Sequence, residues 1–508
     1  MIRPLCWGLA LGLLVLIMTS CAVASDELAE YTIADSTGDW GFPSPYAHYA
    51  RGPGYIRMSF IFDTLVWKDD QGYVPALAEN WDYLEDENAY LLDLRDDVYW
   101  QDGVKFDADD VVFTADYTDD YPYMWVDSTV IERAEKVDDY QVKLYLSEPY
   151  APFMDNVACT LPILPEHVWE DVTNPAGFKD DEALVGTGPY VLKDYNRALG
   201  TYLYEANEDY YQGAPRVNRL KFVKMPDQTT PAALGRSVSA ASVPPEAVSQ
   251  LEGSGLEVVK ASHDWNAKLM INHQKEPFSD PDFRRALAYA IDRENLVEIT
   301  QRGLAEVGSP GMIPQDGIWY NSEVEQYDYD PELAEEIISD LGYEGEEVEL
   351  IFAERGTTGW PGERVAEKVE QQLEAVGLDV TMRSLDGATL DTKVVEWDFD
   401  LALLGHGGLG GDPDVLRRMT LDDILNSVRY YEDDDLIDLL EEQQFEMDRD
   451  NRGDIIDEAQ ELYALDLPAL TLYYPNWYWA HNGEVDLFYT KGGIAIGVPL
   501  PLNKMAFL

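Results

Sequence analysis

The sequence predicts an α/β fold, and two observations carry this prediction. Strand and helix signals alternate along the chain without an internal repeat or a low-complexity segment. The alternation is clearest between residues 348 and 404, where segments of strand length are separated by segments of helix length. Strands that alternate with such helices form βαβ units, so we expect a mainly parallel sheet in this part of the chain.

The α/β region contains three expected strands and two expected helices. The strands are Val348–Ala353, Leu378–Ser384 and Phe399–Leu404, and the helices are Pro361–Val376 and Ala388–Trp397. Gly377 follows the first helix, in the position where a glycine commonly ends one.

The remaining elements are expected from local start and stop signals. Towards the N-terminus we expect strands at Tyr90–Arg95 and Val98–Trp100 and a helix at Asp107–Tyr117. In the middle of the chain we expect a helix capped by Ser279-Asp280-Pro281 and a helix from Asp330-Pro331 to Gly342. On the helix after Asp280, we expect Arg284 and Arg285 to pair with carboxylates at the surface. Towards the C-terminus, helices at about Asp435–Arg449 and Asp454–Ala464 precede an aromatic strand, Leu470–Tyr474.

The chain is strongly acidic. Its 508 residues include 36 basic and 97 acidic side chains, which gives a formal net charge of −61. Nucleic acid is therefore an unfavourable partner, because phosphate binding requires basic surfaces. The acidic residues are spread along the chain, and we interpret them as a solvated coat that keeps the protein soluble, as in a saline habitat.

The N-terminus has the pattern of an export signal. Arg3 is followed by an apolar run from Leu5 to Met18, whose 14 residues are fewer than a bilayer span requires. Three outcomes stay open: cleavage after Ala22-Val23-Ala24, lipidation of Cys21 within Met18-Thr19-Ser20-Cys21, or an uncleaved anchor. Each outcome places residues from about 26 onward outside the cytoplasm, at the cell surface or in a periplasm. Lipidation of Cys21 or an uncleaved anchor would also attach the chain to the membrane through its N-terminus, and this attachment is what we expect.

The body of the chain carries neither a cysteine framework nor a second membrane segment. Only Cys159 lies outside the signal region, so no intramolecular disulfide is expected there. No later apolar run is long enough to span a bilayer, so we do not expect the protein to form a channel.

A glycine-rich motif follows the third expected strand. Residues Gly405–Gly410 satisfy G-x-G-x-x-G, but they lead into Gly411-Asp412-Pro413, so no helix N-terminus faces the glycines to hold a pyrophosphate. Two interpretations remain, a ligand-binding loop at the edge of a sheet and a plain surface loop. His406 is the histidine of interest because it lies in this loop.

No catalytic signature is present, and we expect neither an enzyme nor a cofactor. The sequence lacks H-E-x-x-H, G-x-S-x-G, a Walker A motif and C-x-x-C, and its carboxylates are too many for one pair to stand out. A secreted hydrolase is kept as an alternative from a different class. The dense aromatic segment Tyr473–Trp479 is expected to divide between the core and the wall of a cleft.

An ordered series of segments between residues 55 and 485 resembles the extracellular solute-binding proteins of family 5, the dipeptide-, oligopeptide- and nickel-binding group. The segments are Pro75–Trp81, Leu94–Gly103, Phe106–Phe113, Leu164–His167, Gly186–Tyr190, Asp282–Arg293, Asp412–Asp414 and Asp466–Ala469. The resemblance implies the substrate-binding subunit of an ABC importer, which captures a peptide or peptide-like solute and delivers it to a permease. Its partners are a small solute and permease subunits, and it is expected to be a monomer.

The resemblance also implies a two-lobed, type II periplasmic-binding-protein-like fold of the large three-domain cluster, with a hinge between the lobes. The expected divisions are a signal or lipoprotein peptide (1–25), a main domain of the first lobe (26–65, 186–262 and 475–508), an accessory domain of that lobe (66–185), and a second lobe (263–474). The hinge crossings are expected near residues 262 and 475.

Two departures from the family bear on the ligand. Leu409 stands where peptide binders typically have an aspartate for the ligand's amino group, and Glu363, beside Arg364, stands where dipeptide binders have an arginine for the carboxylate. A zwitterionic dipeptide would therefore lose two charge-assisted contacts. The candidate ligand-binding residues are His406, Gly407, Gly408, Leu409, Asp412, Trp477, Tyr478 and Arg364, with no metal site assigned. A metal chelate, an oligosaccharide and a sensor role stay open as alternatives.

Overall fold

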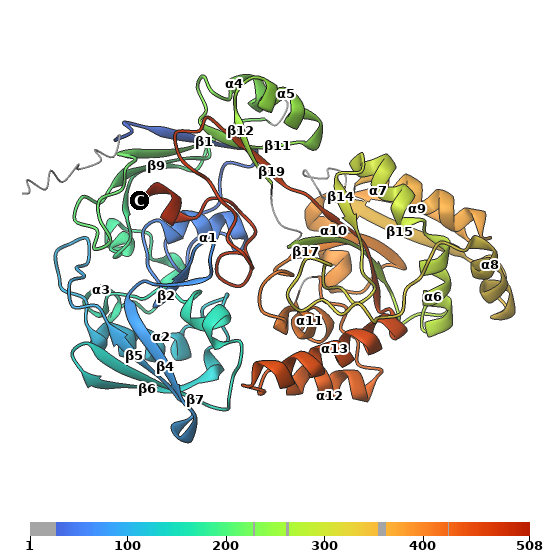
Figure 1. Cartoon of the computed structure of the whole chain (residues 1–508), viewed down its shortest axis with the longest axis horizontal. Coiled ribbons are helices and arrows are strands. Elements are labelled where there is room, and N and C mark those ends of the chain that lie inside the picture. Colours follow the sequence, from blue (N-terminus) through green and yellow to red (C-terminus); the bar gives the residue numbers. More distant parts are fainter. Residues whose placement is uncertain (1–26, 227–228, 261–263, 354–361, 425) are drawn as a thin grey trace, which may run out of the picture.

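A computed structural model of the chain describes residues 27–226, 229–260, 264–353, 362–424 and 426–508. Within these residues the chain forms two lobes that lie side by side in Figure 1, each built around a large mixed sheet. The predicted signal and the lipidation site at Cys21 lie outside the described residues, as does residue 262, where the first hinge crossing is expected.

The first lobe contains a seven-stranded sheet in the order β12-β19-β11-β1-β10-β9-β8. Its strands are β1 (Tyr31–Asp35), β8 (Tyr190–Asn196), β9 (Thr201–Ala206), β10 (Arg219–Lys224), β11 (Ala240–Val243), β12 (Glu257–Lys260) and β19 (Tyr478–His481). The helices α1 (Gly52–Ser59), α4 (Thr230–Ala233) and α5 (Val248–Gly253) accompany this sheet. Strand β1 is central and parallel to both neighbours.

A smaller antiparallel sheet completes the first lobe, below the large sheet in Figure 1. Its order is β4-β5-β7-β6, with β4 (Ala78–Leu84), β5 (Ala89–Leu94), β6 (Ile131–Asp138) and β7 (Gln141–Leu146); the hairpin β2 (Val66–Lys68)–β3 (Tyr73–Pro75) and the helix α3 (Glu166–Trp169) lie beside it. Helix α2 (Ala108–Asp120) packs on this sheet and begins with a capping box between Asp107 and Asp110.

The second lobe contains a six-stranded sheet in the order β14-β18-β13-β17-β15-β16. The strands are β13 (Trp265–Ile271), β14 (Ala305–Val307), β15 (Glu347–Ala353), β16 (Asp379–Leu385), β17 (Leu401–Gly407) and β18 (Ala469–Pro475). The helices are α6 (Pro281–Ala290), α7 (Arg293–Gln301), α8 (Pro331–Asp340), α9 (Glu363–Ala375), α10 (Gly387–Val395), α11 (Asp414–Thr420), α12 (Asp434–Glu442) and α13 (Arg449–Asp466). Both faces of the sheet carry a hydrophobic core, which is why the inner strands β13, β17 and β18 are almost continuously buried, whereas the edge strands β14 and β16 are more exposed.

The prediction of βαβ units with parallel strands between residues 348 and 404 is confirmed, but the six-stranded sheet that contains them is mixed. Strand β15 is parallel to β16 and to β17, as the helical crossovers require. The other three pairings, among β13, β14, β17 and β18, are antiparallel. The reason is the connection to the first lobe: β13 begins and β18 ends at that side, so the two neighbouring strands run in opposite directions.

Several local predictions are confirmed by the structure. Asp280 caps α6 by accepting from the Asp282 amide, and Asp330 caps α8 by accepting from the Leu333 amide. The strand expected at Tyr90–Arg95 is β5, and the strand expected at Leu470–Tyr474 is β18.

Other local predictions need correction. Residues Val98–Trp100 are not a strand, because only Tyr99 pairs, in an isolated bridge to Lys105. The helix expected at about 435–449 ends at Glu442, since Asp448 caps the next helix by accepting from two amides. Arg284 is fully buried, and its guanidinium donates to carbonyl groups of Phe278, Ser279 and Asp466 instead of a surface carboxylate.

Two chain segments join the large sheets, between β12 and β13 and between β18 and β19 (Figure 1). Apart from Pro475 at the end of β18, the strands of the seven-stranded, four-stranded and six-stranded sheets fall within the three sets of residues expected for the main domain, the accessory domain and the second lobe. We propose these divisions as the domains of the protein, with the segment between β18 and β19 as part of its hinge.

Candidate functional site

A cavity of about 1200 Å³ lies between the two lobes. The first lobe supplies the segment after β1, the residues that lead into α1, and the C-terminal stretch Ile496–Leu502. The second lobe supplies residues of β13, β17, α10 and α11. A site between two lobes is where two-lobed binding proteins in general enclose a solute.

Tryptophan dominates the apolar walls of this cavity. Trp40, Trp125, Trp265, Trp477 and Trp479 all line it, from both lobes and from the segment between β18 and β19. The rings of Trp265 and Trp477 have centroids 6.1 Å apart. Flat aromatic walls bind apolar side chains and planar amide groups of a ligand by stacking, and such stacking does not select one particular side chain.

Three ion pairs lie on the cavity wall. Arg57 contacts Asp35 at 2.7 Å and Arg197 contacts Asp39 at 3.4 Å, both within the first lobe. Arg51 contacts Asp391 of α10 at 3.7 Å, so this pair crosses between the lobes.

Asp35 is held ionised although its side chain is largely enclosed. Burial by itself raises the pKa of Asp35, but the Arg57 guanidinium and hydrogen bonds from Gly38, Trp40 and Thr37 outweigh it, so the pKa is lowered. The Arg57 guanidinium in turn lies 4.0 Å from the ring centroid of Phe222. This pair therefore forms a rigid charged corner of the cavity.

Of the candidate residues named from the sequence, Gly407 and Trp477 line the cavity. Tyr478 packs with the core on the opposite face of β19, whereas its neighbour Trp479 is the residue that lines the cavity, because alternate residues of a strand face opposite sides. Leu409 is buried in the second-lobe core, and Arg364 is exposed on α9.

His406 lies inside the second lobe rather than in a loop. The strand β17 continues to Gly407, so the strand expected to end at Leu404 is longer and includes Gly405 and His406. Burial and the nearby positive charges of Lys268 and Arg418 hold the pKa of His406 well below its usual range. Among the described residues, neither ring nitrogen has a hydrogen-bond partner.

Glycines of the predicted motif pack against a second glycine-rich segment near the C-terminus. A Cβ atom on Gly497 would lie 2.3 Å from the Cα atom of Gly408, and one on Gly492 would lie 3.0 Å from the carbonyl oxygen of Gly410. No side chain fits in such a contact. The glycines thus let the backbones of the two lobes touch beside the cavity, a role that neither interpretation from the sequence included.

This backbone contact predicts an effect of Gly497→Ala. Gly497 has φ +95° and Gly103 has φ +93°, but a Cβ on Gly103 meets nothing within 4 Å. Both substitutions impose the same backbone strain, so Gly497→Ala is expected to lower the free energy of unfolding by about 2 kcal/mol more than Gly103→Ala. Urea unfolding of the two variants measures the difference; equal losses would contradict the contact.

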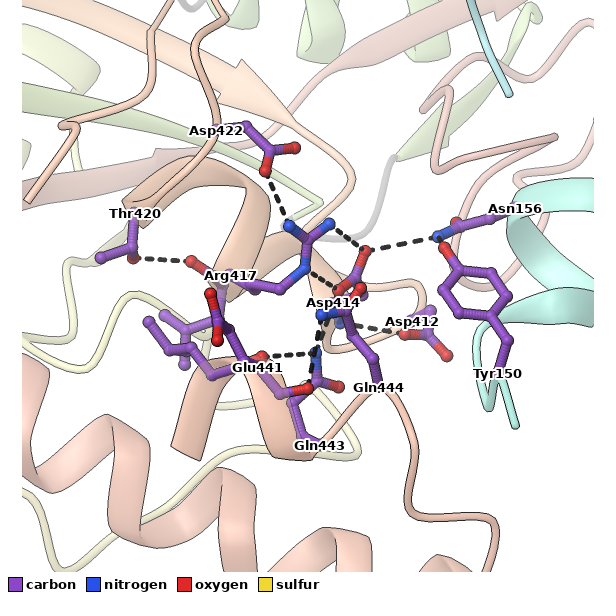
Figure 2. Close-up of polar contacts among 12 residues, drawn as sticks. Tyr150, Asn156, Asp412, Asp414, Arg417, Thr420, Asp422, Glu441, Gln443 and Gln444 are labelled. Atoms are coloured by element: carbon purple, nitrogen blue, oxygen red, sulfur yellow. Dashed lines mark hydrogen bonds and ion pairs between the residues drawn. The ribbon is translucent and has the colours of Figure 1, made fainter. Parts of the chain in front are cut away.

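Asp412 and Asp414 hold a buried polar cluster, shown in Figure 2. The Asp412 carboxylate accepts from both terminal nitrogens of Arg452, at 2.7 and 2.9 Å. Asp414 accepts from Arg417 at 2.7 and 3.2 Å and from the Gln443 amide at 3.0 Å. Burial raises the pKa of Asp414 and Arg417 lowers it, with a net lowering. The two carboxylates thus fix α11, which forms part of the cavity wall.

The same cluster contacts the first lobe. Figure 2 shows Asn156, from the accessory region, directed at Asp414; its side-chain amide donates to Asp414 at 3.4 Å and to the Tyr150 hydroxyl at 2.9 Å. Beside it, the Ala151 amide donates to the Gln444 carbonyl at 2.7 Å. A smaller cavity of about 420 Å³ adjoins these contacts.

His48 of the cavity wall predicts a pH effect. Its ring contacts the Tyr49 carbonyl at 3.0 Å and the Tyr123 hydroxyl at 3.2 Å, and burial lowers its pKa from 6.5 to about 4, although the Tyr49 carbonyl opposes the shift. Because the folded-state pKa is depressed, the stability that neutral His48 contributes is present above about pH 6.5 and is lost as the pH falls towards 4.

We expect this contribution to be about 3 kcal/mol. Urea unfolding from pH 7 to 4.5, compared between the natural protein and His48→Gln, isolates it from the titration of carboxylates. The variant is expected to lose less stability over this range; identical pH profiles would contradict the assignment.

Sequence reasoning missed most of the cavity wall. Residues 36–53, Trp265 and Ile496–Leu502 belong to no motif, and they meet only when distant segments pack together. Trp479 lies in the aromatic segment Tyr473–Trp479, part of which was expected to line a cleft. The glycines of residues 492–497 are a further signal, because a second glycine cluster indicates close backbone contact.

Residues 72–423 match the family described as bacterial extracellular solute-binding proteins, family 5 (middle region). This chain belongs to that family. The resemblance stated from the sequence motifs is thereby confirmed, and the match covers most of the accessory region, strands β8 to β12 of the first lobe and most of the second lobe. Members of this family are solute-binding proteins that act outside the cytoplasm.

Relatives and solved structures agree with the family. The chain is 26% identical over 445 residues to di/tripeptide-binding protein 2 of Pseudomonas aeruginosa, covering 81% of this chain and 83% of the relative. Its fold matches the ABC transporter substrate-binding protein CtaP of Listeria monocytogenes with a TM-score of 0.81 and 22% identity, covering 93% and 98% of the two chains. It matches the periplasmic binding protein DppA of Helicobacter pylori, solved with the peptide STSA, with a TM-score of 0.78 and 24% identity, covering 93% and 97%.

These matches confirm the α/β, two-lobed solute-binding fold predicted for this family 5 protein. In the parts of the chain that the structure describes, no helix has the length and apolar character to cross a bilayer. Within the same residues, no three histidine, cysteine, aspartate or glutamate side chains gather in a way that would hold a metal ion.

Proposed function

We propose that this protein is the substrate-binding subunit of an ABC importer and that it captures a peptide or peptide-like solute. The observation that carries the proposal is the cavity of about 1200 Å³ walled by tryptophans of both lobes. That volume exceeds the usual range for small-molecule sites, about 300–1000 Å³, and suits an extended solute of several residues. Family membership supports the role in uptake.

Capture depends on lobe closure in this proposal. Trp265 of the second lobe and Trp479 of the first lobe face the same cavity, with Trp477 between β18 and β19. A solute that touches all three walls binds the closed arrangement more tightly than an open one, and so shifts the lobes towards closure. The closed form is the shape that a permease would recognise.

Native mass spectrometry of the protein after incubation with an oligopeptide mixture tests the proposal. Retention of peptides at one to one, with a change in tryptophan fluorescence, is the expected result, because five tryptophans line the cavity. Recovery of the bound peptides unchanged after prolonged incubation is expected of a carrier; shortened peptides would indicate a hydrolase. Retention of only sugars or metal chelates would overturn the peptide assignment.

The metal-chelate alternative rested on His406 and the acidic surface. His406 is enclosed in the second lobe, and the ring of His48, which does line the cavity, contacts protein atoms at both nitrogens. The described geometry therefore favours the peptide-like solute.

Attachment to the membrane through the N-terminus is part of the proposal. Cys21 is the candidate for lipidation, and Ala22-Val23-Ala24 is the candidate for cleavage. The mass of the mature N-terminal peptide distinguishes them, because a lipidated Cys21 starts the chain four residues before Ser25 and carries acyl chains. A neighbouring permease and ATPase in the genome would separate transport from sensing.

A further inference from the structure

The cavity carries a charge balance opposite to that of the whole protein. The chain has 97 acidic and 36 basic side chains, but the cavity is lined by five basic residues and three acidic ones. The basic residues are Arg51, Arg57, Lys179, Arg197 and Arg418, and the acidic ones are Asp35, Asp39 and Asp391. Since acidic residues are so abundant elsewhere, a basic excess here calls for an explanation.

All three carboxylates of the cavity wall are already paired. Asp35 contacts Arg57, Asp39 contacts Arg197 and Asp391 contacts Arg51, at 2.7, 3.4 and 3.7 Å. None is left to receive an amino group of a ligand without breaking an existing pair. Leu409, which stands where peptide-binding relatives place an aspartate, is itself only 2% exposed in the second-lobe core.

Two cations of the wall remain, Arg418 and Lys179. In the described part of the chain, neither makes an ion pair or a side-chain hydrogen bond to a carboxylate. Arg417 is different, because Asp414 and Asp422 each contact it at 2.7 Å (Figure 2). The two adjacent arginines of α11 thus divide their roles. Arg417 fixes the helix, whereas Arg418 lines the cavity and acts on Asp414 and His406 only through its charge, without a direct ion pair.

Arg418 is well placed to meet a solute. It lines both the main cavity and the smaller adjoining cavity, and its side chain is half-buried. A guanidinium in such a site binds a carboxylate through two parallel hydrogen bonds, and partial exclusion of water strengthens the attraction. Lys179, which is exposed at the rim, adds a second positive charge.

We propose that Arg418 binds an anionic group of the solute and that the cavity selects peptide-like solutes of net negative charge. This inference rests on the proposed function and narrows its substrate class. The negative charge of the protein surface does not prevent an anionic solute from binding, because dissolved ions screen that charge beyond about 8 Å at physiological ionic strength. The charge of Arg418 in the partly buried site is screened much less. The paired carboxylates leave basic peptides without a counter-charge.

Calorimetric titration of the mature protein with three tripeptides tests this selectivity. Ala-Glu-Ala, Ala-Gln-Ala and Ala-Lys-Ala have the same termini and similar size, so the central side chain is the variable. We expect Ala-Glu-Ala to bind about tenfold or more tightly than Ala-Gln-Ala, and Ala-Lys-Ala to bind most weakly. In Arg418→Gln the affinity for Ala-Glu-Ala is expected to fall about 10- to 100-fold, with little change for Ala-Gln-Ala.

Two further variants sharpen the test. Arg418→Lys keeps the charge and is expected to keep most of the preference for the acidic peptide. Arg236→Gln removes one charge from an exposed loop outside the cavity and is expected to leave all three affinities unchanged. Equal affinities of the natural protein for the three peptides, or an unchanged preference in Arg418→Gln, would overturn the inference and leave the proposed function standing. Binding of none of the three by the natural protein would overturn the peptide assignment together with the inference.

Discussion

Lys504→Met is expected to lower the free energy of unfolding by about 3–5 kcal/mol. Lys504 and Asp63 form an ion pair in which their side chains are 1% and 0% exposed. Thr187 also donates to Asp63, at 3.1 Å, and the Lys504 ammonium lies 4.1 Å from the ring centroid of Trp67. Burial lowers the pKa of Lys504 although Asp63 opposes the shift, so the site tolerates the charge only because its partner is present.

The size of this effect comes from the charge that remains. Methionine fills a similar volume but leaves Asp63 buried without its counter-charge, which costs far more than the pair itself contributes. The double variant Asp63→Asn with Lys504→Met removes both charges and is expected to recover a large part of the loss. Chemical denaturation of the two variants and the natural protein gives the comparison. A loss of less than about 1 kcal/mol in the free energy of unfolding of Lys504→Met would show that Asp63 is not left as a buried, unpaired charge.

This pair matters for the site because it fixes the C-terminal segment. Lys504 begins the short 3₁₀ helix Lys504–Phe507, and the residues just before it, Ile496–Leu502, line the cavity. We therefore expect Lys504→Met to weaken solute binding as well, through a loosened wall.

Arg452→Met is the second substitution with a large expected effect, again a loss of about 3–5 kcal/mol. Arg452 of α13 is 6% exposed, and its guanidinium contacts Asp412 and also both the carbonyl and the side-chain oxygen of Gln443. Burial raises the pKa of Asp412 and Arg452 lowers it, with a net raising, so the carboxylate depends on this partner to stay ionised. Without Arg452, α11 and the cavity wall that it carries lose their support.

Arg449→Met is the matched control for this prediction. Arg449 lies on the same helix but is exposed, with its guanidinium 5.2 Å from the ring centroid of Trp319, so its loss is expected to cost less than about 1 kcal/mol. Urea unfolding separates the two variants. Similar stabilities for Arg452→Met and Arg449→Met would contradict the structural role of the Asp412–Arg452 pair and favour Asp412 as a residue held for the solute.

The sequence was most informative where structure depends on local pattern. The elements from β15 to β17 follow from hydrophobic periodicity and from residues such as Gly377 and Asp330 that end or begin helices. The antiparallel orientation of β13 and β18 in the sheet was not predicted, because it depends on where the chain passes from one lobe to the other. Periodicity within the second lobe carries no information about that crossing.

The candidate site was predicted less well, for a physical reason. Gly407 and Trp477 reach the cavity, but Tyr478 and Trp479 differ by one position on a strand, and only the fold decides which of them faces the cavity. Likewise, nothing in the sequence distinguishes Arg417 from Arg418; the carboxylates that occupy Arg417 come from Asp414 and Asp422, and their geometry is set by the packing of α11.

A crystal structure of the mature protein saturated with a peptide that native mass spectrometry retains would test the central claim most directly. The structure described here predicts electron density for the peptide in the cavity between the lobes, in contact with Trp265 and Trp479 and with an anionic group at Arg418. Density for the peptide on the outer surface, or in contact with one lobe alone, would contradict the account.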